Sequence, residues 1–437
     1  MSDLKQIARQ VFHETLAAID IPLAMRRKLR PEGSRLHCDE SVLELRNFKR
    51  FRVVAIGKAT HAMLAGLRSL LPDAIEFRGV ASAPTPPNPA LAGIEYFLGG
   101  HPIPNAASWH SAEAILKLLA DCDDSTLVFF LLSGGGSALC ELPLIPHMTL
   151  EDLQHFYRVL VTCGAPIAEM NTVRKHFSVI KGGRLAAAAG RATKLTLAVT
   201  DVPADHISAL ASGPTLPDPS TVAEVARIAA RYNMTAQFPP SFRNSVSERQ
   251  LPETPKHDHP AFSNAHFLLL LGMHDLFHPA HHALEARGFR ACCDNATDDW
   301  PVHKAAEYLL AQLAAWKSAN PGRHVAVIAD GEVSSPVTGD GLGGRNSAFV
   351  LSCVENIVGQ RIAVLSAGTD GIDGNSPAAG AVADGETLSR ALAAGLHPAD
   401  FFQRSDAYNF FVRLDDAILT GPIGNNLRDL RILLAEP

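Results

Sequence analysis

Several features that mark common protein classes are missing from this chain of 437 residues. Charged residues make up only 19% of it and its formal net charge is −6, so no basic excess suggests binding to nucleic acid or to an anionic membrane. The longest apolar run, residues 127–132, is far too short to cross a bilayer. The N-terminal stretch carries charges throughout and lacks the apolar core of a signal peptide. We therefore expect a cytoplasmic protein with neither a nucleic-acid nor a membrane partner.

Cysteine is also scarce, with seven residues scattered along the chain. The number is odd, no CxxC pair occurs, and Cys292 and Cys293 are adjacent in a segment with the composition of a strand. This pattern is typical of reduced, mostly buried thiols and excludes a disulfide framework or a zinc site of the usual spacing.

What the sequence does contain is ample apolar material, 47% of its residues, in a repeating order. Its length exceeds the roughly 250–300 residues at which one core usually stops growing, so we expect two domains. Short apolar runs end in glycine and polar residues and are followed by helix-like segments, and because these runs are continuously apolar they predict strands buried on both faces of a parallel, doubly wound sheet. The predicted strands are 52–56, 80–83, 127–132, 195–199, 267–271, 325–329 and 362–366, and the predicted helices include 7–19, 111–119, 150–161 and 302–316. A proline-rich polar stretch, 236–262, indicates a linker or a long surface excursion, which gives domains at 1–245 and 262–437.

Glycine-rich and charged clusters follow these predicted strands directly. They read AIGKAT, GGHPIPN, LLSGGGSAL, AVTDVPAD, IADGEVSS and SAGTDGIDG. Ligands of open parallel sheets bind outside the carboxyl ends of the strands, so these clusters are expected to line one polar cleft.

The triple glycine is the strongest candidate for binding an anion. Its residues are Ser133, Gly134, Gly135, Gly136 and Ser137. Backbone N–H groups without a neighbouring Cβ can cradle a phosphate, although a flexible turn would have the same composition. The chain contains no GxxxxGK[ST], so it is not a Walker A protein, and the glycine pattern at 339–344 is weak evidence for a dinucleotide site by itself.

Cationic side chains accompany this loop. Lys58 follows a strand at a predicted helix start, where a cation is unfavourable unless an anion is near. Arg345 follows four glycines, His101 lies between glycine and proline, and Arg174, Lys175 and Lys181 belong to the basic run 170–186. Such residues can bind phosphates and stabilise their charge during transfer, while a solvated basic helix face is the alternative for the run.

Carboxylates occur in the same positions relative to the strands. The candidates are Asp201, Asp205, Asp330, Glu332, Asp370 and Asp373. They can bind Mg²⁺ or accept a hydroxyl proton, although Asp-Gly pairs also form ordinary turns.

Taken together, these motifs resemble those of one family. LLSGGGSALCELP, NTVRKHFSVIKGGRLA, TDVPADHISALASGPT, GDGLGGRN, SAGTDGIDGNSPAAGAVAD and TGPIGNNLRDL are similar, in the same order, to the motifs of the MOFRL-type glycerate 2-kinases. The resemblance runs from about residue 50 to 430. It implies a larger Rossmann-like N-terminal α/β domain, a smaller C-terminal α/β domain and an active site in the cleft between them.

The resemblance also implies an activity, the ATP-dependent and Mg²⁺-dependent phosphorylation of D-glycerate to 2-phosphoglycerate. By motif match, Lys58 and Arg345 are the expected catalytic residues and 133–137 the phosphate loop. We add Asp201 as a catalytic residue, His101, Arg174, Lys175 and Lys181 as phosphate or substrate ligands, and Asp370, Asp205 and Glu332 as metal ligands. The substrate is expected to be a small hydroxy-acid, and the protein a monomer or a homodimer.

The sequence departs from the family pattern in several of these loops, at Ala204, Asp330, Ser347, Ala348 and Ile423. Two alternatives therefore stay open. One is an NAD(P)-dependent hydroxypyruvate reductase, since members of the family also carry that name, although the first predicted strand lacks a dinucleotide fingerprint. The other is a homologue that binds a metabolite without turning it over.

Overall fold

A computed structural model of the chain describes residues 3–39, 41–200, 202, 204–247, 251–272, 274–423 and 427–437, without the side chains of 204–206 and 246–247. The chain forms two compact units, which we call the N-unit (Ile21–Leu271) and the C-unit (Met1–Asp20 with Gly272–Pro437). The polar stretch 236–262 lies within the N-unit, before its last strand, so the units differ in extent from the expected 1–245 and 262–437.

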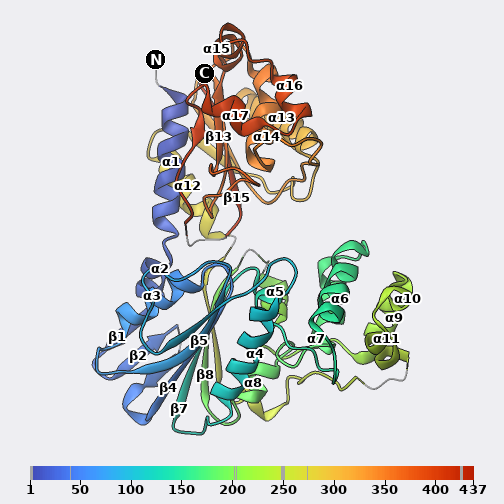
Figure 1. The fold of residues 1–437 in the computed structure, drawn as a ribbon. Helices are drawn as coiled ribbons and strands as arrows, with labels where there is room; N and C mark the ends of the chain where they lie inside the picture. Colours follow the sequence, from blue (N-terminus) through green and yellow to red (C-terminus); the bar gives the residue numbers. More distant parts are fainter. Residues whose placement is uncertain are drawn as a thin grey trace. The chain divides into compact units, whose positions relative to one another are not determined.

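The N-unit is built on a six-stranded sheet in which every neighbouring pair is parallel (Figure 1). Its order is β6-β5-β4-β7-β8-β9, so the direction of winding reverses between β4 and β7. The strands are β4 (Arg50–Ile56), β5 (Phe77–Ala83), β6 (Ile94–Leu98), β7 (Thr126–Leu132), β8 (Thr193–Val199) and β9 (Ala265–Leu271). The prediction of a parallel, doubly wound sheet is confirmed here, and the gap beyond β4 and β7 is the usual ligand position in such sheets.

Helices cover both faces of this sheet. Helices α4 and α8 pack on the face formed by residues such as Val54, Val128 and Phe130, and α3 packs against β4, β5 and β7 on the other face (Figure 1). The helices of the N-unit are α2 (Ile21–Lys28), α3 (Thr60–Leu70), α4 (Ala106–Leu119), α5 (Gly136–Leu139), α6 (Leu150–Thr162), α7 (Ile167–His176), α8 (Arg184–Ala188), α9 (Val222–Arg231), α10 (Met234–Gln237) and α11 (Pro240–Ser247), with short 3-10 turns at Leu45–Asn47, Ala204–Ser212 and Pro260–Phe262.

Two smaller parts complete the N-unit. Strands β1 (Leu29–Glu32), β2 (Arg35–Cys38) and β3 (Ser41–Glu44) form an antiparallel sheet. The helices that follow β7 pack around a second apolar core, which contains stacked aromatic rings. The ring centroids of Phe156 and Phe242 lie 4.0 Å apart.

The C-unit contains a mixed sheet of order β10-β11-β15-β12-β13-β14. Its strands are β10 (Arg290–Cys293), β11 (Val325–Asp330), β12 (Ile362–Gly368), β13 (Gly380–Asp384), β14 (Ala417–Ile418) and β15 (Asp429–Ala435). Only β10 and β11 are parallel, whereas β15 lies between β11 and β12 and is antiparallel to both. The inference of parallel neighbours from continuous apolarity is therefore wrong for β12, and it holds for β11 only on the side of β10. Burial on both faces, which makes a strand continuously apolar, does not depend on strand direction.

Helices also cover both faces of the mixed sheet. The helices of the C-unit are α1 (Leu4–Ala18), α12 (His274–Glu285), α13 (Val302–Ala319), α14 (Arg345–Val354), α15 (Thr387–Ala393), α16 (Pro398–Gln403) and α17 (Ala407–Val412), with a 3-10 turn at Glu355–Ile357. Helices α1 and α12 lie side by side against the strands, and α13 and α14 pack on the core of the opposite face (Figure 1). The first predicted helix is confirmed as α1, which buries Val11 and Phe12.

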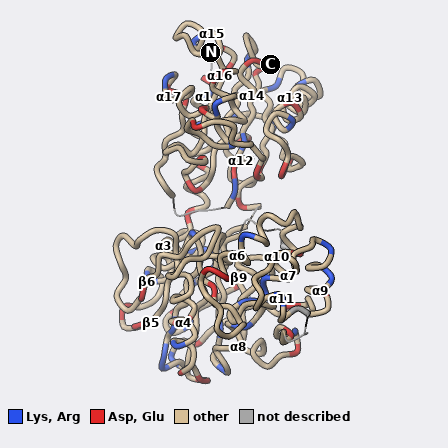
Figure 2. The backbone as a smooth tube through the Cα atoms, turned by 45° about the vertical axis from the view of Figure 1, so that its right-hand side comes forward, with Lys and Arg blue, Asp and Glu red and all other residues tan. Residues whose placement is uncertain are grey.

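Charges are distributed without a large region of one sign. Figure 2 shows Lys and Arg interspersed with Asp and Glu along both units. Within the described ranges, no helix combines the length and the apolar character needed to traverse a lipid bilayer. The seven cysteines are all free thiols, as expected.

Candidate functional site

The point where the winding of the N-unit sheet reverses brings Lys58 to the triple glycine. Strands β4 and β7 are paired in register up to Ile56 and Leu132, so the loops that follow them leave the same edge together. The Lys58 amide donates to the Gly134 carbonyl (2.9 Å), and the Ala59 amide donates to the Ser133 hydroxyl (2.9 Å). The prediction that the Lys58 loop and the triple-glycine loop lie together is therefore confirmed, because their backbones are hydrogen-bonded to each other.

Gly135 forms the centre of this arrangement. Its φ of +80° is left-handed, and a Cβ there would lie 3.2 Å from His101 Cδ2 and 3.3 Å from Lys58 Cγ. The side chains of His101 and Lys58 therefore flank a backbone that only glycine fits. Burial lowers the pKa of His101, and the nearby charges of Lys58 and Arg174 lower it further. His101 is therefore expected to be uncharged at neutral pH.

The glycine loop itself presents unused backbone donors. The amides of Gly134, Gly135, Gly136 and Ser137 donate to no backbone or side-chain acceptor among the residues that the structure describes. Because helix α5 has only four residues, these amides form a turn-like nest and not the end of a long helix. Consecutive free amides of this kind bind anions.

Arg174 adds a buried cation beside the loop. The residue is only 6% exposed, and its Nη1 donates to Asn171 Oδ1 (2.6 Å) while its guanidinium lies 5.2 Å above the ring of Tyr157. No described carboxylate forms an ion pair with it, and its Nε has no hydrogen-bond partner. A buried guanidinium normally needs a counter-charge. Arg174 is therefore suited to an anionic ligand.

A chain of hydroxyl and amide groups connects Arg174 to the glycine loop. Ser137 shares a hydrogen bond with Ser212 (2.8 Å), and Ser212 donates to Asn171 Oδ1 (3.0 Å). Sequence reasoning missed Asn171 and Ser212. Asn171 precedes Arg174 by three residues on α7, a helical spacing that could have indicated it. Ser212 adopts a left-handed φ of 60°, which no local pattern predicts for a serine.

The other two lysines of the basic run are already neutralised. Lys175 pairs with Asp218 (3.2 Å) and Lys181 with Glu141 (3.1 Å), and all four side chains are buried. Lys181 also donates to the Cys140 carbonyl (2.9 Å). The structure thus separates these lysines from Arg174, although the sequence presents the three cations as one group.

Arg345, the second expected catalytic cation, belongs to the C-unit, at the start of α14. Its Nε contacts Asp429 Oδ2 (2.5 Å) and its Nη2 contacts Glu332 Oε1 (2.7 Å). Burial lowers the pKa of Arg345, but the two carboxylates raise it by more, so its pKa lies above the ordinary value. The guanidinium is therefore permanently charged.

The N-terminus of α14 is capped by an acidic residue. The Asn346 and Ser347 amides donate to the two oxygens of Asp373 (2.9 and 2.8 Å), and the Ser347 hydroxyl does so as well (2.6 Å). This cap fixes the first turn, and with it the backbone of Arg345.

Further charges surround Arg345 in the C-unit. Arg431 is fully buried and donates to the Gly331 carbonyl (2.9 Å), and Arg428 pairs with Asp298. Asp330 is fully buried with both oxygens lacking a hydrogen bond, and its nearest cation is Arg428 at 3.9 Å. Burial raises the pKa of Asp330 despite this arginine.

The remaining predicted acids are placed as follows. Asp201 and the side chain of Asp205 lie outside the described residues. Glu332 pairs with Arg345, and Asp370 accepts a hydrogen bond from the Ile372 amide (3.1 Å). Across the described side chains, no group of three His, Cys, Asp or Glu residues could hold a metal ion. A Mg²⁺ that keeps waters and phosphate oxygens needs only one or two carboxylates, and carboxylate oxygens are suitable donors for it. Both oxygens of Glu332, however, already contact Arg345.

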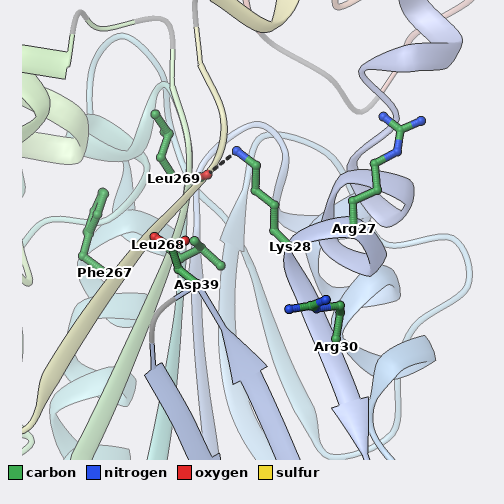
Figure 3. Close-up of a pocket in the computed structure, with 7 residues that line it drawn as sticks. All are labelled: Arg27, Lys28, Arg30, Asp39, Phe267, Leu268 and Leu269. Carbon is green, nitrogen blue, oxygen red and sulfur yellow. Dashed lines mark hydrogen bonds between the residues drawn. The ribbon is translucent and has the colours of Figure 1, made fainter.

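A basic hollow lies elsewhere in the N-unit, beside the edge strand β9. Its volume is about 500 Å³, and it is lined by Arg27, Lys28, Arg30, Asp39 and residues 267–269. Figure 3 shows the Lys28 ammonium on the Leu269 carbonyl (2.8 Å) while Arg27 points away from the strand. Lys28 thus satisfies an edge-strand carbonyl, a common protection of sheet edges, and the cations do not converge on one point.

Comparisons with known proteins agree with this architecture. Residues 7–247 match the family model described as "Domain of unknown function (DUF4147)", and residues 325–429 match the MOFRL family model. The chain is 32% identical over 389 residues to a D-glycerate 2-kinase of Thermotoga maritima, covering 88% of this chain and 91% of that protein. It is 35% identical over 442 residues to a protein of Agrobacterium vitis named "Putative hydroxypyruvate reductase", covering 98% and 94%. The crystal structure of a glycerate kinase from Thermotoga maritima superposes with a TM-score of 0.84 at 30% identity, over the full length of both chains.

Proposed function

Since the chain belongs to the DUF4147/MOFRL glycerate kinase family, we propose that it transfers the γ-phosphoryl group of ATP to the 2-hydroxyl of D-glycerate. The hydroxyl oxygen forms a bond to phosphorus, the bond from phosphorus to the ADP oxygen breaks, and the hydroxyl proton passes to a base. The products are 2-phosphoglycerate and ADP.

The observation that carries this proposal is the anion site of the N-unit. Lys58 and His101 flank Gly135, and Arg174 is near enough to lower the pKa of His101. No described carboxylate pairs with Lys58 or Arg174, and four loop amides have no acceptor among the described residues. Both glycerate and the phosphoryl group are anionic, and phosphoryl transfer depends on positioning and on electrostatic stabilisation. This site therefore supports a reaction in which negative charge is held and stabilised.

We assign roles within this reaction as follows. Lys58 stabilises the charge of the transferred group, and Arg174 with the amides of 134–137 holds an anionic group of the substrate complex. Asp201 remains the proposed proton acceptor. When bound with ATP, Mg²⁺ would neutralise phosphate charge, and Glu332 and Asp370 are its proposed ligands.

Arg345 is the cation proposed from the C-unit. An active site in the cleft between the two domains is thus part of the proposal, since Lys58 and Arg345 must act on the same substrate complex. Glu332 and Asp429 fix the position of the charged Arg345 guanidinium, and a phosphate would compete with these two carboxylates for it.

The decisive experiment measures ADP release from ATP with D-glycerate, and identifies the product by phosphorus NMR. Lys58→Ala and Arg345→Ala should each lower kcat about 10²–10³-fold, the usual effect of removing one charge-stabilising group. Lys117→Ala is the matched control, because Lys117 is exposed on α4 and belongs to no site. Wild-type rates in Lys58→Ala or Arg345→Ala would remove that residue from the mechanism.

The same assay separates the rival functions. Formation of NAD(P)H from NAD(P)⁺ and glycerate, without ADP, would replace the kinase by a reductase, the activity in the name of the Agrobacterium vitis relative. Tight binding of hydroxy-acids by calorimetry, without any turnover, would instead identify a binding protein.

A further inference from the structure

The C-unit contains a partly open hollow that none of the roles above uses. It has a volume of about 450 Å³ and lies between the loop after β11, helix α16 and the start of α14. Its lining contains no Asp, Glu, Lys or Arg. The volume falls in the usual range of ligand pockets, roughly 300–1,000 Å³. We call it the α14 pocket.

The walls of the α14 pocket are held in place by hydrogen bonds. On one side, the Thr338 amide donates to the Ser405 hydroxyl (2.9 Å) and the Thr338 hydroxyl donates to the Gln403 carbonyl (2.8 Å). On the other side, the Val302 amide donates to the Ser334 carbonyl (2.9 Å). A pocket with fixed walls binds a ligand without first having to order its loop.

Apolar surface dominates the α14 pocket. Val337 is 81% exposed and Phe402 39% exposed, so both present apolar surface that a ligand can cover. The Phe402 ring can stack on a flat heterocycle, and Val337 can pack against it.

The polar groups of the pocket are neutral. The hydroxyl of Ser335 and the ring of His303 have no hydrogen-bond partner within the described part of the chain. They can bind the ring nitrogens and amino groups of a base. An anionic substrate would lose its hydration here without gaining a cation, so glycerate does not suit this pocket.

The position of the α14 pocket relates it to phosphoryl transfer. Gly343 and Gly344 line it, and the next residue is Arg345. Because Asp373 already occupies the Asn346 and Ser347 amides, the helix start offers little to a phosphate. Arg345, which pairs with Glu332 and Asp429, is the cation that directly follows these two glycines in the chain.

We propose that the α14 pocket binds the purine nucleoside of the phosphoryl donor, with the phosphates extending toward Arg345. This inference rests on the proposed function for the identity of the ligand as ATP. It assigns to the C-unit the recognition of the base, for which the sequence offers no motif.

Two variants of the full chain test this site. Phe402→Ala removes the stacking surface and Ser335→Phe fills the pocket, and each should raise the KM for ATP at least fivefold while the KM for D-glycerate stays within twofold. Leu392→Ala is the control, since Leu392 is 48% exposed on α15 and lies outside the pocket. Unchanged KM values for ATP in both variants would overturn the nucleoside site and leave the kinase proposal intact.

A binding measurement separates the two proposals. Wild-type protein is titrated with ADP in a calorimeter, without hydroxy-acid, and is labelled with 8-azido-ATP followed by peptide mapping. We expect label within 334–344 or 401–407, suppressed by excess ADP. ADP binding with this label but without turnover would retain the pocket and reject the kinase. Label confined to other segments, or no ADP binding, would reject the pocket even if the variants were unstable.

Discussion

At the scale of single residues, the basic run on and after α7 shows what the sequence can and cannot specify. It identifies Arg174, Lys175 and Lys181 as one group of cations, of which only Arg174 lacks a carboxylate partner among the described residues. It does not reveal that Asp218 and Glu141 neutralise the two lysines, because these carboxylates reach them only through the tertiary fold. The distinction between a structural and a ligand-binding cation is thus made by contacts distant in sequence.

This distinction predicts opposite effects for two substitutions. Arg174→Met should change the free energy of unfolding by only about 1 kcal/mol, since it removes one hydrogen bond and one ring contact, but it should lower kcat/KM about 10²–10³-fold. Lys181→Met should cost about 3–5 kcal/mol, because it leaves Glu141 buried without its counter-charge. Urea unfolding and steady-state kinetics measure both. An equally large loss of stability in Arg174→Met would show that Arg174 is a structural residue.

Buried His176 predicts a pH dependence of stability. Burial lowers its pKa, against smaller opposing effects of the Thr172 carbonyl and nearby acids. Below the ordinary histidine pKa of about 6.5, the unfolded chain therefore binds a proton that the folded protein does not accept. The stabilising contribution is present above that pH and is lost as the pH falls toward the lowered value.

The test is to compare urea unfolding at pH 7.5 and 5.5. His176→Gln should lose less free energy of unfolding between the two pH values than the wild type does. His13→Gln, on the exposed side of α1, should lose as much as the wild type. Equal losses in His176→Gln and wild type would show that His176 is protonated without penalty in the fold.

At the scale of elements, each of the seven strands predicted from an apolar run is present in the structure, from β4 to β12. The helices predicted from apolar spacing at 111–119, 150–161 and 302–316 are present as α4, α6 and α13. Pairing direction in the C-unit could not be predicted, because β15 enters between β11 and β12 from the far end of the sequence. The contact between Lys58 and the triple glycine was predictable, since both loops follow strands of one parallel sheet.

The glycine loop offers a matched pair of substitutions. Gly135→Ala places a methyl group against His101 and Lys58, whereas Gly33→Ala, at a φ of +59°, has nothing within 4 Å. Both should cost about 1–2 kcal/mol of stability, because alanine disfavours the left-handed conformation. Only Gly135→Ala should reduce kcat/KM, by about tenfold or more. Similar kinetics in both variants would exclude the loop from the site.

At the scale of the molecule, the proline-rich stretch 236–262, interpreted as a linker or a long surface excursion, is a segment of the N-unit. The N-unit is inserted, as residues 21–271, between α1 and α12 of the C-unit. Sequence patterns could not show this, because α1 has the amphipathic pattern of any surface helix. Its partners are side chains more than 250 residues away, such as Asp416, which Lys5 contacts at 2.9 Å.

Hydrogen exchange can test this division. Phe12 is fully buried on α1, so Phe12→Ala should cost about 3–5 kcal/mol and raise amide exchange in β12 and β15. Val128→Ala, in the sheet of the N-unit, should instead raise exchange in β4 and β8. Exchange that rises equally in both units in either variant would show that they unfold as one cooperative body.

The insertion also dictates an order of assembly during synthesis. A ribosome adding roughly 5–20 residues per second completes β4 to β9 long before it reaches β15. Helix α1 would leave the exit tunnel before the N-unit yet wait for partners that are translated after the N-unit, with its apolar side open to chaperones meanwhile. The central position of β15 means that the mixed sheet cannot close until β15 has been translated.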